Sequence, residues 1–242
     1  MSWLRPLFLV ATLLVVASPA GAESLTLDFG EGGTLTGRIV QLIALLTILS
    51  LAPSILVMVT SFTRIVVVLS FLRSALGLQQ TPPNAVLISL ALFLTAFVMA
   101  PVLQEAYDNG IAPLVREEIT EQQAFDRTMS PVHKFMMAHV RQQDLALFMD
   151  ISEAQVDVPE ETPLSALIPA FMISELRRAF EIGFLLFVPF LVIDMVVASV
   201  LMSMGMLMLP PITISLPFKL IFFVLVDGWY LVAGSLVRSF GS

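Results

Sequence analysis

Three long stretches of this sequence contain no charged residue, and they constrain its fold more than any other feature. They cover 39–63, 74–104 and 195–218, which are 25, 31 and 24 residues long. An apolar helix of about 20 residues crosses the roughly 30 Å hydrocarbon core of a bilayer. Apolar and polar residues do not alternate strictly in these stretches, which favours helices over the strands of a membrane barrel. We therefore predict an all-α membrane protein of helical hairpins, with four long hydrophobic helices at about 39–60, 85–103, 182–202 and 212–236.

The composition of the whole chain agrees with this prediction. Of the 242 residues, 57% are hydrophobic and 13% are charged, and the mean hydropathy is +0.93. A water-soluble fold could not cover so much apolar surface with so few charges. The net charge is −7, without a basic patch for nucleic acid. The composition thus excludes an ordinary soluble enzyme, a disordered chain and a nucleic-acid binder, and the lack of cysteine excludes disulfides and thiolate metal sites.

The first 22 residues have the pattern of a secretory signal peptide. Arg5 supplies a positive start, 7–17 is an apolar run, and Pro19 precedes a small-residue sequence that ends at Ala22. The run is too short to span a bilayer, which favours cleavage between Ala22 and Glu23 over an uncut membrane anchor. The N-terminus of the mature chain is then expected outside the cytoplasm.

The order of segments follows from this leader and from the charge distribution. The first helix would run inward and place the 61–84 connection, which carries Arg64 and Arg73 and no acid, in the cytoplasm. Residues 104–163 carry twelve acids and four bases, which suits an external region. We expect five parts: the signal peptide (1–22), a short periplasmic N-terminal segment (23–38), a first hydrophobic hairpin (39–103), a polar acidic periplasmic domain with helices (104–168) and a second hairpin with a methionine-rich tip (169–242).

The second hairpin does not fit a free-standing membrane anchor. Its tip, 203–217, has no charge, whereas Arg177 and Arg178 precede its first helix on the expected outer side. Pro53 and Pro189 are expected to kink or break their helices, and such helices at membrane depth need protein around them. A charge at the centre of a membrane helix costs about 2.5–3.5 kcal/mol, and four charges lie inside or against apolar runs: Arg64, Asp194, Lys219 and Asp227. This pattern predicts a hairpin buried in an assembly.

Four charges at the start of the second hairpin lie at helical spacings. Glu175 and Arg178 are three residues apart, and Arg177 and Glu181 are four apart, so each pair can form along one helix. Two interpretations stay open. The pairs are local, or the charges meet neighbouring subunits in a partly dry interface, with Asp194, Lys219 and Asp227 as further candidates for such contacts.

The stretch 202–211 reads MSMGMLMLPP and is the most unusual in the chain. It contains Met202, Met204, Met206 and Met208, and Gly205 and the two prolines at its end disfavour a continuous helix. Methionine is unbranched and adaptable, so core filling is one interpretation. A flexible apolar loop at an uncharged hairpin tip, repeated around an axis, would instead form a deformable seal, because apolar constrictions gate by dewetting. The sequence favours the seal.

Catalytic and metal-binding patterns are absent from the sequence. There is no nucleophile elbow and no glycine-rich phosphate loop, so we predict no enzymatic activity and no cofactor. The Ser130-Pro131 pair resembles a helix N-cap with proline at the first helical position. His133 and His139 on the helix that follows would lie on opposite faces, which predicts two surface imidazoles and no metal site.

Three segments together resemble the FliP family of flagellar export-gate proteins. They are 53–102, 169–211 and 216–229, and the last of them reads LPFKLIFFVLVDGW. The likeness rests on long runs of sequence and covers almost all of the mature chain. The signal peptide also suits the flagellar branch of this family.

The resemblance implies a role and a set of partners. FliP-like proteins are core subunits of the flagellar type III export apparatus in the bacterial inner membrane, within the basal body and with periplasmic exposure. Copies assemble with one another and with FliQ-like and FliR-like membrane proteins into a ring-like helical gate, next to other export components. Unfolded rod, hook and filament subunits pass through it. The family's methionine-rich loop seals the pore, and 205–211 match it, with Leu207 where the family pattern has methionine. Met204, Met206, Leu207 and Met208 are the expected seal residues.

Three alternatives stay open. The nearest is the export-gate subunit of a virulence injectisome, which shares the core. A small ion-coupled transporter with Arg64, Asp194 and Asp227 as a relay is less favoured, because four spans are few and no inverted repeat is evident. A purely structural scaffold of the basal body would tolerate substitution at 202–208.

Overall fold

A computed structural model of the chain describes residues 35–152, 162–206 and 208–241. Every regular element in these residues is a helix, which confirms the all-α prediction. The chain divides into two units, residues 1–50 and residues 51–242. Helix α2 (Leu35–Met58) begins in the first unit and ends in the second, and all later helices belong to the second unit.

The long helices agree in part with the four predicted segments. Helix α2 covers the first of them, and α4 (Asn84–Ala106) matches the second closely. Helix α8 (Leu164–Ser203) begins well before the predicted position 182, because the charged residues that precede this position are part of the helix. The fourth segment is divided into α9 (Pro211–Leu225) and α10 (Gly228–Arg238), which meet at 64°. Asp227, in the left-handed conformation, lies between them.

Helix α3 (Phe62–Ala75) corrects the prediction for residues 61–84. These residues were expected to connect two helices, but only 76–83 form a turn. The buried side chains Ile65, Val68, Leu69 and Leu72 recur at helical spacing and pack α3 against α8. Gly77 allows the turn, since its φ of 77° is in the region that favours glycine. Hydropathy did not identify this helix, because Arg64 and Arg73 interrupt its apolar sequence.

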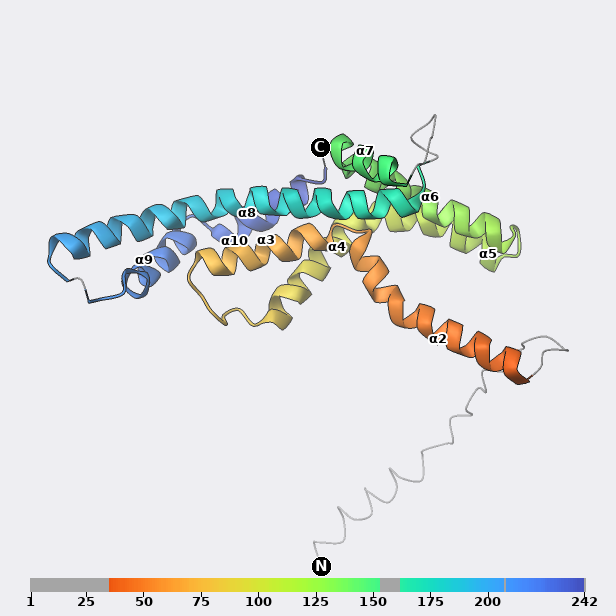
Figure 1. Cartoon of the computed structure of the whole chain (residues 1–242), viewed down its shortest axis with the longest axis horizontal. Coiled ribbons are helices and arrows are strands. Elements are labelled where there is room, and N and C mark those ends of the chain that lie inside the picture. The colour runs from red at the N-terminus through yellow and green to blue at the C-terminus, as the bar shows by residue number, and fades with distance from the viewer. Residues whose placement is uncertain (1–34, 153–161, 207, 242) are drawn as a thin grey trace, which may run out of the picture. The chain divides into compact units, whose positions relative to one another are not determined.

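The main core lies where α3, α4, α8, α9 and α10 meet. Figure 1 shows α8 as the long helix with α3, α9 and α10 beside it. Its buried members are all apolar: Ile65, Val68, Leu69, Leu72, Ala75, Leu76, Leu87, Ala91, Ala179, Phe190, Phe223, Val232 and Leu236. At Gly183 the contact between α8 and α3 is so close that a Cβ atom would lie 2.6 Å from Phe71 Cδ2.

The acidic region folds into short helices around a second core. It contains a π-helical turn η1 (Tyr107–Ile111), α5 (Ala112–Val115), α6 (Glu121–His139) and α7 (Gln142–Ile151). Residues of α6 pack with Met99 of α4 and with α8 through a cluster of Val59, Met99, Phe135, Met136, Leu167 and Phe171.

The start of α6 differs from the prediction. Thr120 is the N-cap, and it forms a capping box with Gln123, so the helix begins ten residues before Ser130-Pro131. Pro131 lies inside the helix and is buried. The expected N-cap at Ser130 is therefore wrong, because the capping box provides a stronger start upstream.

Prolines do not break the long helices. Pro189 and Pro169 lie within α8, which continues over 40 residues, and α2 continues through position 53. A proline removes one backbone donor, and neighbouring protein can compensate this loss. Phe190, next to Pro189, is buried in the main core. Of the kink or break expected at Pro53 and Pro189, the break is absent at both positions.

Within the part of the chain that the structure describes, two helices are long and apolar enough to cross a membrane. They are Asn84–Val115, which continues α4 through η1 and α5, and α8 itself. The number among the described residues rises to four if α2 with α3, and α9 with α10, each count as one bent span. By the length and composition of these helices, the described part of the chain has the character of a membrane protein.

Candidate functional site

The tip of the second hairpin is a structured turn between α8 and α9. At the end of α8 the Gly205 N–H donates to Met202 O and the Met206 N–H donates to Leu201 O, both at 3.0 Å. These two bonds, with Gly205 at φ 74°, form a Schellman motif. Pro210 and Pro211 then begin α9. The turn therefore depends on backbone bonds and on the glycine.

The methionines of this tip point away from the core. The exposed fractions are 59% for Met202, 66% for Met204, 41% for Met206 and 98% for Met208. Core filling, one of the two interpretations of these residues, does not apply within one subunit. Leu207, the fourth expected seal position, lies outside the described residues.

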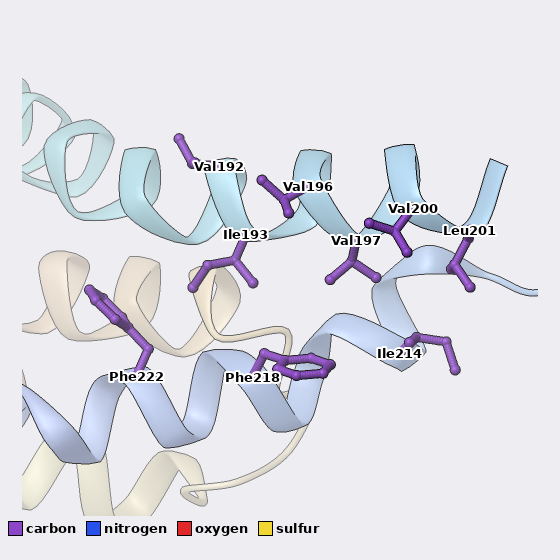
Figure 2. Close-up of a pocket in the computed structure, with 9 residues that line it drawn as sticks. All are labelled: Val192, Ile193, Val196, Val197, Val200, Leu201, Ile214, Phe218 and Phe222. Atoms are coloured by element: carbon purple, nitrogen blue, oxygen red, sulfur yellow. The ribbon is translucent and has the colours of Figure 1, made fainter. Parts of the chain in front are cut away.

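Behind the tip, α8 and α9 enclose an apolar groove of about 560 Å³. Figure 2 shows Ile193 and Val197 pointing from α8 toward α9, where Phe218 lies. All of its lining residues are apolar: Val192, Ile193, Val196, Val197, Val200, Leu201, Ile214, Phe218 and Phe222. The two helices thus stay partly separated near the tip, and the hairpin exposes apolar side chains there.

An ion pair joins the two helices of the hairpin beside this groove. Lys219 Nζ of α9 donates to Asp194 Oδ2 of α8 at 2.6 Å and to the carbonyl of Ala75, the last residue of α3, at 3.1 Å. Ser215 Oγ donates to Asp194 Oδ1 at 2.5 Å. The Lys219 side chain is 4% exposed, and a cation suits the C-terminal end of a helix. These contacts join α3, α8 and α9.

A second ion pair lies in the core between α3 and α8. Arg64 Nε donates to Glu175 Oε2 at 2.8 Å, and Arg64 Nη2 donates to Glu175 Oε1, so the pair is bidentate. The other terminal nitrogen, Nη1, donates to the carbonyl and the hydroxyl of Ser239 at 3.1 and 2.9 Å. The guanidinium carbon lies 3.7 Å from the ring centroid of Phe240. Arg64 therefore fixes the end of the chain to the core.

These contacts correct part of the prediction for the charged residues. Glu175 pairs with Arg64 and not with Arg178, because its side chain points into the core, where it is completely buried. The Arg177–Glu181 pair of the local interpretation forms within the chain, with Nε and Oε1 3.0 Å apart, and both side chains are more than half exposed. Glu175, Asp194 and Lys219 are thus satisfied by partners within the chain.

The remaining candidates lie on the surface. Asp227 is exposed between α9 and α10, and Arg178 is partly exposed on α8. No ion pair of either side chain occurs within residues 35–152, 162–206 and 208–241. The three members of the suggested relay are not brought together as one chain of contacts, since Arg64 bonds Glu175 and Asp194 bonds Lys219.

The two histidines are not both at the surface. His139 is buried, and its Nδ1 lies 2.7 Å from the carbonyl oxygen of Phe135. His133 is partly exposed, and its Nε2 lies 2.8 Å from the carbonyl oxygen of Thr162. The expected surface position of His139 is wrong, because Phe135 and Phe240 pack against its ring. The described residues contain no group of three His, Asp or Glu that could hold a metal ion.

The expected cleavage between Ala22 and Glu23 lies outside the described residues.

The sequence analysis did not identify Ser215, Ser239 and Phe240 as partners of the buried charges. Serine and phenylalanine are common in apolar helices, so their presence does not indicate a site. Only the presence of the charged Arg64 and Lys219 in or against apolar runs indicated that such partners had to exist.

Comparison with known proteins gives the same family over most of the chain. Residues 45–236 match the model of the FliP family. A protein of Caulobacter vibrioides named Flagellar biosynthetic protein FliP is 61% identical over 96% of this chain and 87% of its own length. Proteins with the same name are 56% identical in Bacillus subtilis, over 83% of this chain and 91% of the relative, and 51% identical in Aquifex aeolicus, over 88% and 90%.

Proposed function

The chain belongs to the FliP family, and from this premise we propose that it is a pore-forming core subunit of the flagellar type III protein-export gate. Its relatives are named flagellar biosynthetic proteins, and the chain is a membrane-associated flagellar component. It would pass unfolded rod, hook and filament subunits across the inner membrane while the flagellum is built.

One observation carries this proposal: a very long hairpin ends in an exposed methionine tip. Helix α8 has 40 residues and is therefore about 60 Å long, roughly twice the thickness of the hydrocarbon core. Its side chains at the tip are apolar and uncovered. A simple membrane span needs neither this length nor such a tip, whereas subunits arranged around a pore would use both.

The exposed surface of α8 suits contacts with other subunits. Phe184 and Leu185 are each 69% exposed, and Val196 is 58% exposed. We propose that copies of this chain, together with FliQ-like and FliR-like proteins, cover this surface in a ring-like complex. Arg177, Arg178, Glu181 and Asp227 would then be the charges available for contacts between subunits, since Glu175, Asp194 and Lys219 are paired internally.

The methionine tips would form the pore seal. Met204, Met206 and Met208, with Leu207, would meet copies of themselves and exclude ions and water, because apolar constrictions dewet. Leucine has a similar volume to methionine, so Leu207 is compatible with the seal. Methionine side chains adapt their shape, which lets such a seal part around a passing chain.

The location and chemistry follow from the same proposal. The complex would lie in the inner membrane at the basal body, with the acidic helices 104–168 on the periplasmic side. The family is a structural component of the export gate, and we propose no catalytic role and no cofactor for this chain. Energy for export would then come from other components of the apparatus.

The rival functions have less support. The relatives compared above are named flagellar biosynthetic proteins. The transporter would need Arg64, Asp194 and Asp227 along one path, whereas Arg64 is bonded to Glu175 and Asp194 to Lys219. A pure scaffold leaves the exposed methionine tip without a role.

Purification of the tagged full chain from its own cells, followed by particle imaging, tests the proposal. We expect a ring or short helix of several copies together with FliQ-like and FliR-like proteins, with the α8–α9 tips toward the axis. A monomer that transports a solute when reconstituted alone would contradict the proposal.

A further inference from the structure

The segment that follows α10, residues 239–241, contacts both cores of the second unit. Phe240 is partly buried, and its side chain packs against the main core as well as against the second core. Among the residues that the structure describes, it is the one apolar side chain that belongs to both sets of contacts. We propose that this segment is a strap that couples the second hairpin to the acidic helices, with Phe240 as the coupling residue.

On the side of the main core, Arg64 holds the strap. Its Nη1 donates to the carbonyl oxygen and to the hydroxyl of Ser239 at 3.1 and 2.9 Å, and its guanidinium carbon lies 3.7 Å from the centroid of the Phe240 ring. The attraction of a cation to an aromatic ring is strongest where water is excluded, and the Arg64 side chain is 1% exposed. The strap is therefore held by the same arginine that joins α3 and α8.

On the side of the second core, two rings of α6 hold the strap. The ring centroids of Phe240 and Phe135 are 6.1 Å apart, and those of Phe240 and His139 are 5.3 Å apart. The Nε2 atom of His139 also lies 3.4 Å from the carbonyl oxygen of Phe240. Aromatic pairs at such distances stabilise a contact beyond the apolar area that they bury. Arg64 and α6 thus meet through one phenylalanine.

The strap is also bonded to the helix that precedes it. The Ser239 N–H donates to Ser235 O at 3.0 Å, and the Phe240 N–H donates to Val237 O at 3.2 Å, so the strap continues the hydrogen bonding of α10. Leu236, one turn before Phe240, is 1% exposed in the main core. A displacement of Phe240 from α6 is therefore passed to α10.

Helix α10 differs in this respect from α4 and α8. Within the described residues, α4 and α8 each supply buried members of both cores, whereas α10 supplies members of the main core alone. The coupling between α6 and α10 therefore depends on the strap. This inference goes beyond the proposed function, since it concerns how a change in the acidic helices reaches the second hairpin, whatever the chain transports.

Hydrogen exchange measured by mass spectrometry on the purified complex tests the coupling. Met136→Ala makes a cavity in the second core, where Met136 is completely buried, and should raise the exchange rate of α10 about fivefold through the strap. In the double variant with Phe240→Ala, the same cavity should raise exchange in α6 but change α10 by less than about twofold. Because coupling free energies are reciprocal, Leu236→Ala should raise exchange at the end of α6.

Phe62→Ala is the matched control. Phe62 is also a partly buried phenylalanine, but within the described residues it packs against the main core and not against the second core. A merely structural loss of one phenylalanine would be the same at both positions, so the effect of Met136→Ala on α10 should persist in Phe62→Ala. Phe240→Tyr keeps the ring and should keep the coupling.

Phe240→Leu keeps apolar volume without the ring, so it should fold even if Phe240→Ala does not, and it should lose most of the coupling. If Met136→Ala changes the exchange of α10 equally with and without the Phe240 ring, the strap does not couple the two regions and the inference is wrong. No effect of Met136→Ala on α10 in the otherwise unsubstituted chain would overturn it as well. Neither result bears on the role of the chain in export.

Discussion

Arg64 and Glu175 form a bidentate ion pair in the core although 111 residues separate them in the sequence. Both side chains are at most 1% exposed. Arg64 also bonds Ser239 and lies over the ring of Phe240, so one guanidinium joins α3, α8 and the end of the chain. The pair therefore holds the second hairpin to the first.

Arg64→Ala should destabilise the chain by about 3–5 kcal/mol, because it leaves the Glu175 carboxylate buried without a partner. Thermal unfolding of the full chain in detergent measures this loss. Arg177→Ala is the matched control, since that pair is more than half exposed and should contribute less than about 0.5 kcal/mol.

The double variant R64M/E175M extends this test. It removes both charges and keeps an apolar filling, so it should recover much of the stability that Arg64→Ala loses. If the double variant is as unstable as Arg64→Ala, the bonds to Ser239, and not the buried carboxylate, dominate the loss.

Lys219→Met should lower the free energy of unfolding by about 2 kcal/mol, because it weakens the contact that joins α3, α8 and α9. It removes the bonds to Asp194 and to the carbonyl of Ala75, but Asp194 is 27% exposed and keeps the hydroxyl of Ser215, so the loss is smaller than for Arg64. Hydrogen exchange measured by mass spectrometry should show faster exchange at the ends of α3 and α9. Unchanged exchange there would contradict a role of Lys219 in joining these helices.

Gly205→Ala should weaken the turn of the tip by about 1–2 kcal/mol through backbone conformation alone. The glycine has φ 74°, and a Cβ atom there would meet nothing within 4 Å, so the left-handed conformation is the only obstacle. Gly234→Ala is the control, because its Cβ also meets nothing and its φ is not in that region; it should be neutral or stabilising. Hydrogen exchange at 204–209 compares the two variants, and equal effects would remove the special role of Gly205.

Hydropathy predicted the parts of the fold that depend on local sequence, and it missed the parts that depend on distant partners. Helix α4 was predicted closely because its charge-free run is bounded by polar residues. Helix α3 was missed because Arg64 and Arg73 interrupt its apolar run. The partner of Arg64 is Glu175, far away in the sequence, and the partner of Arg73 is Asn84, at the start of α4. The neutralisation of a buried charge cannot be read from spacing within one helix.

The same limit applies to the charged residues of α8. The spacing of Arg177 and Glu181 allowed a local pair as one of two interpretations, and this pair forms because both side chains lie on the exposed side of the helix. The spacing of Glu175 and Arg178 suggested a pair that does not form, because burial turns Glu175 toward α3. The methionine tip was predicted from Gly205 and the prolines, whose backbone preferences are local.

Replacement of Met206 and Met208 by alanine should make the gate leak ions while the complex still assembles. The two side chains are 41% and 98% exposed in one subunit, so their loss leaves the core unchanged and removes only the apolar bulk at the tip. A wider constriction fills with water and conducts, because dewetting requires a narrow apolar passage. Ion flux through vesicles that contain the assembled complex measures the leak, and M206L/M208L is the control that keeps apolar volume. A leak in the leucine variant equal to that in the alanine variant would mean that methionine itself, and not apolar volume, forms the seal; no leak in either would refute a sealing role for these two residues.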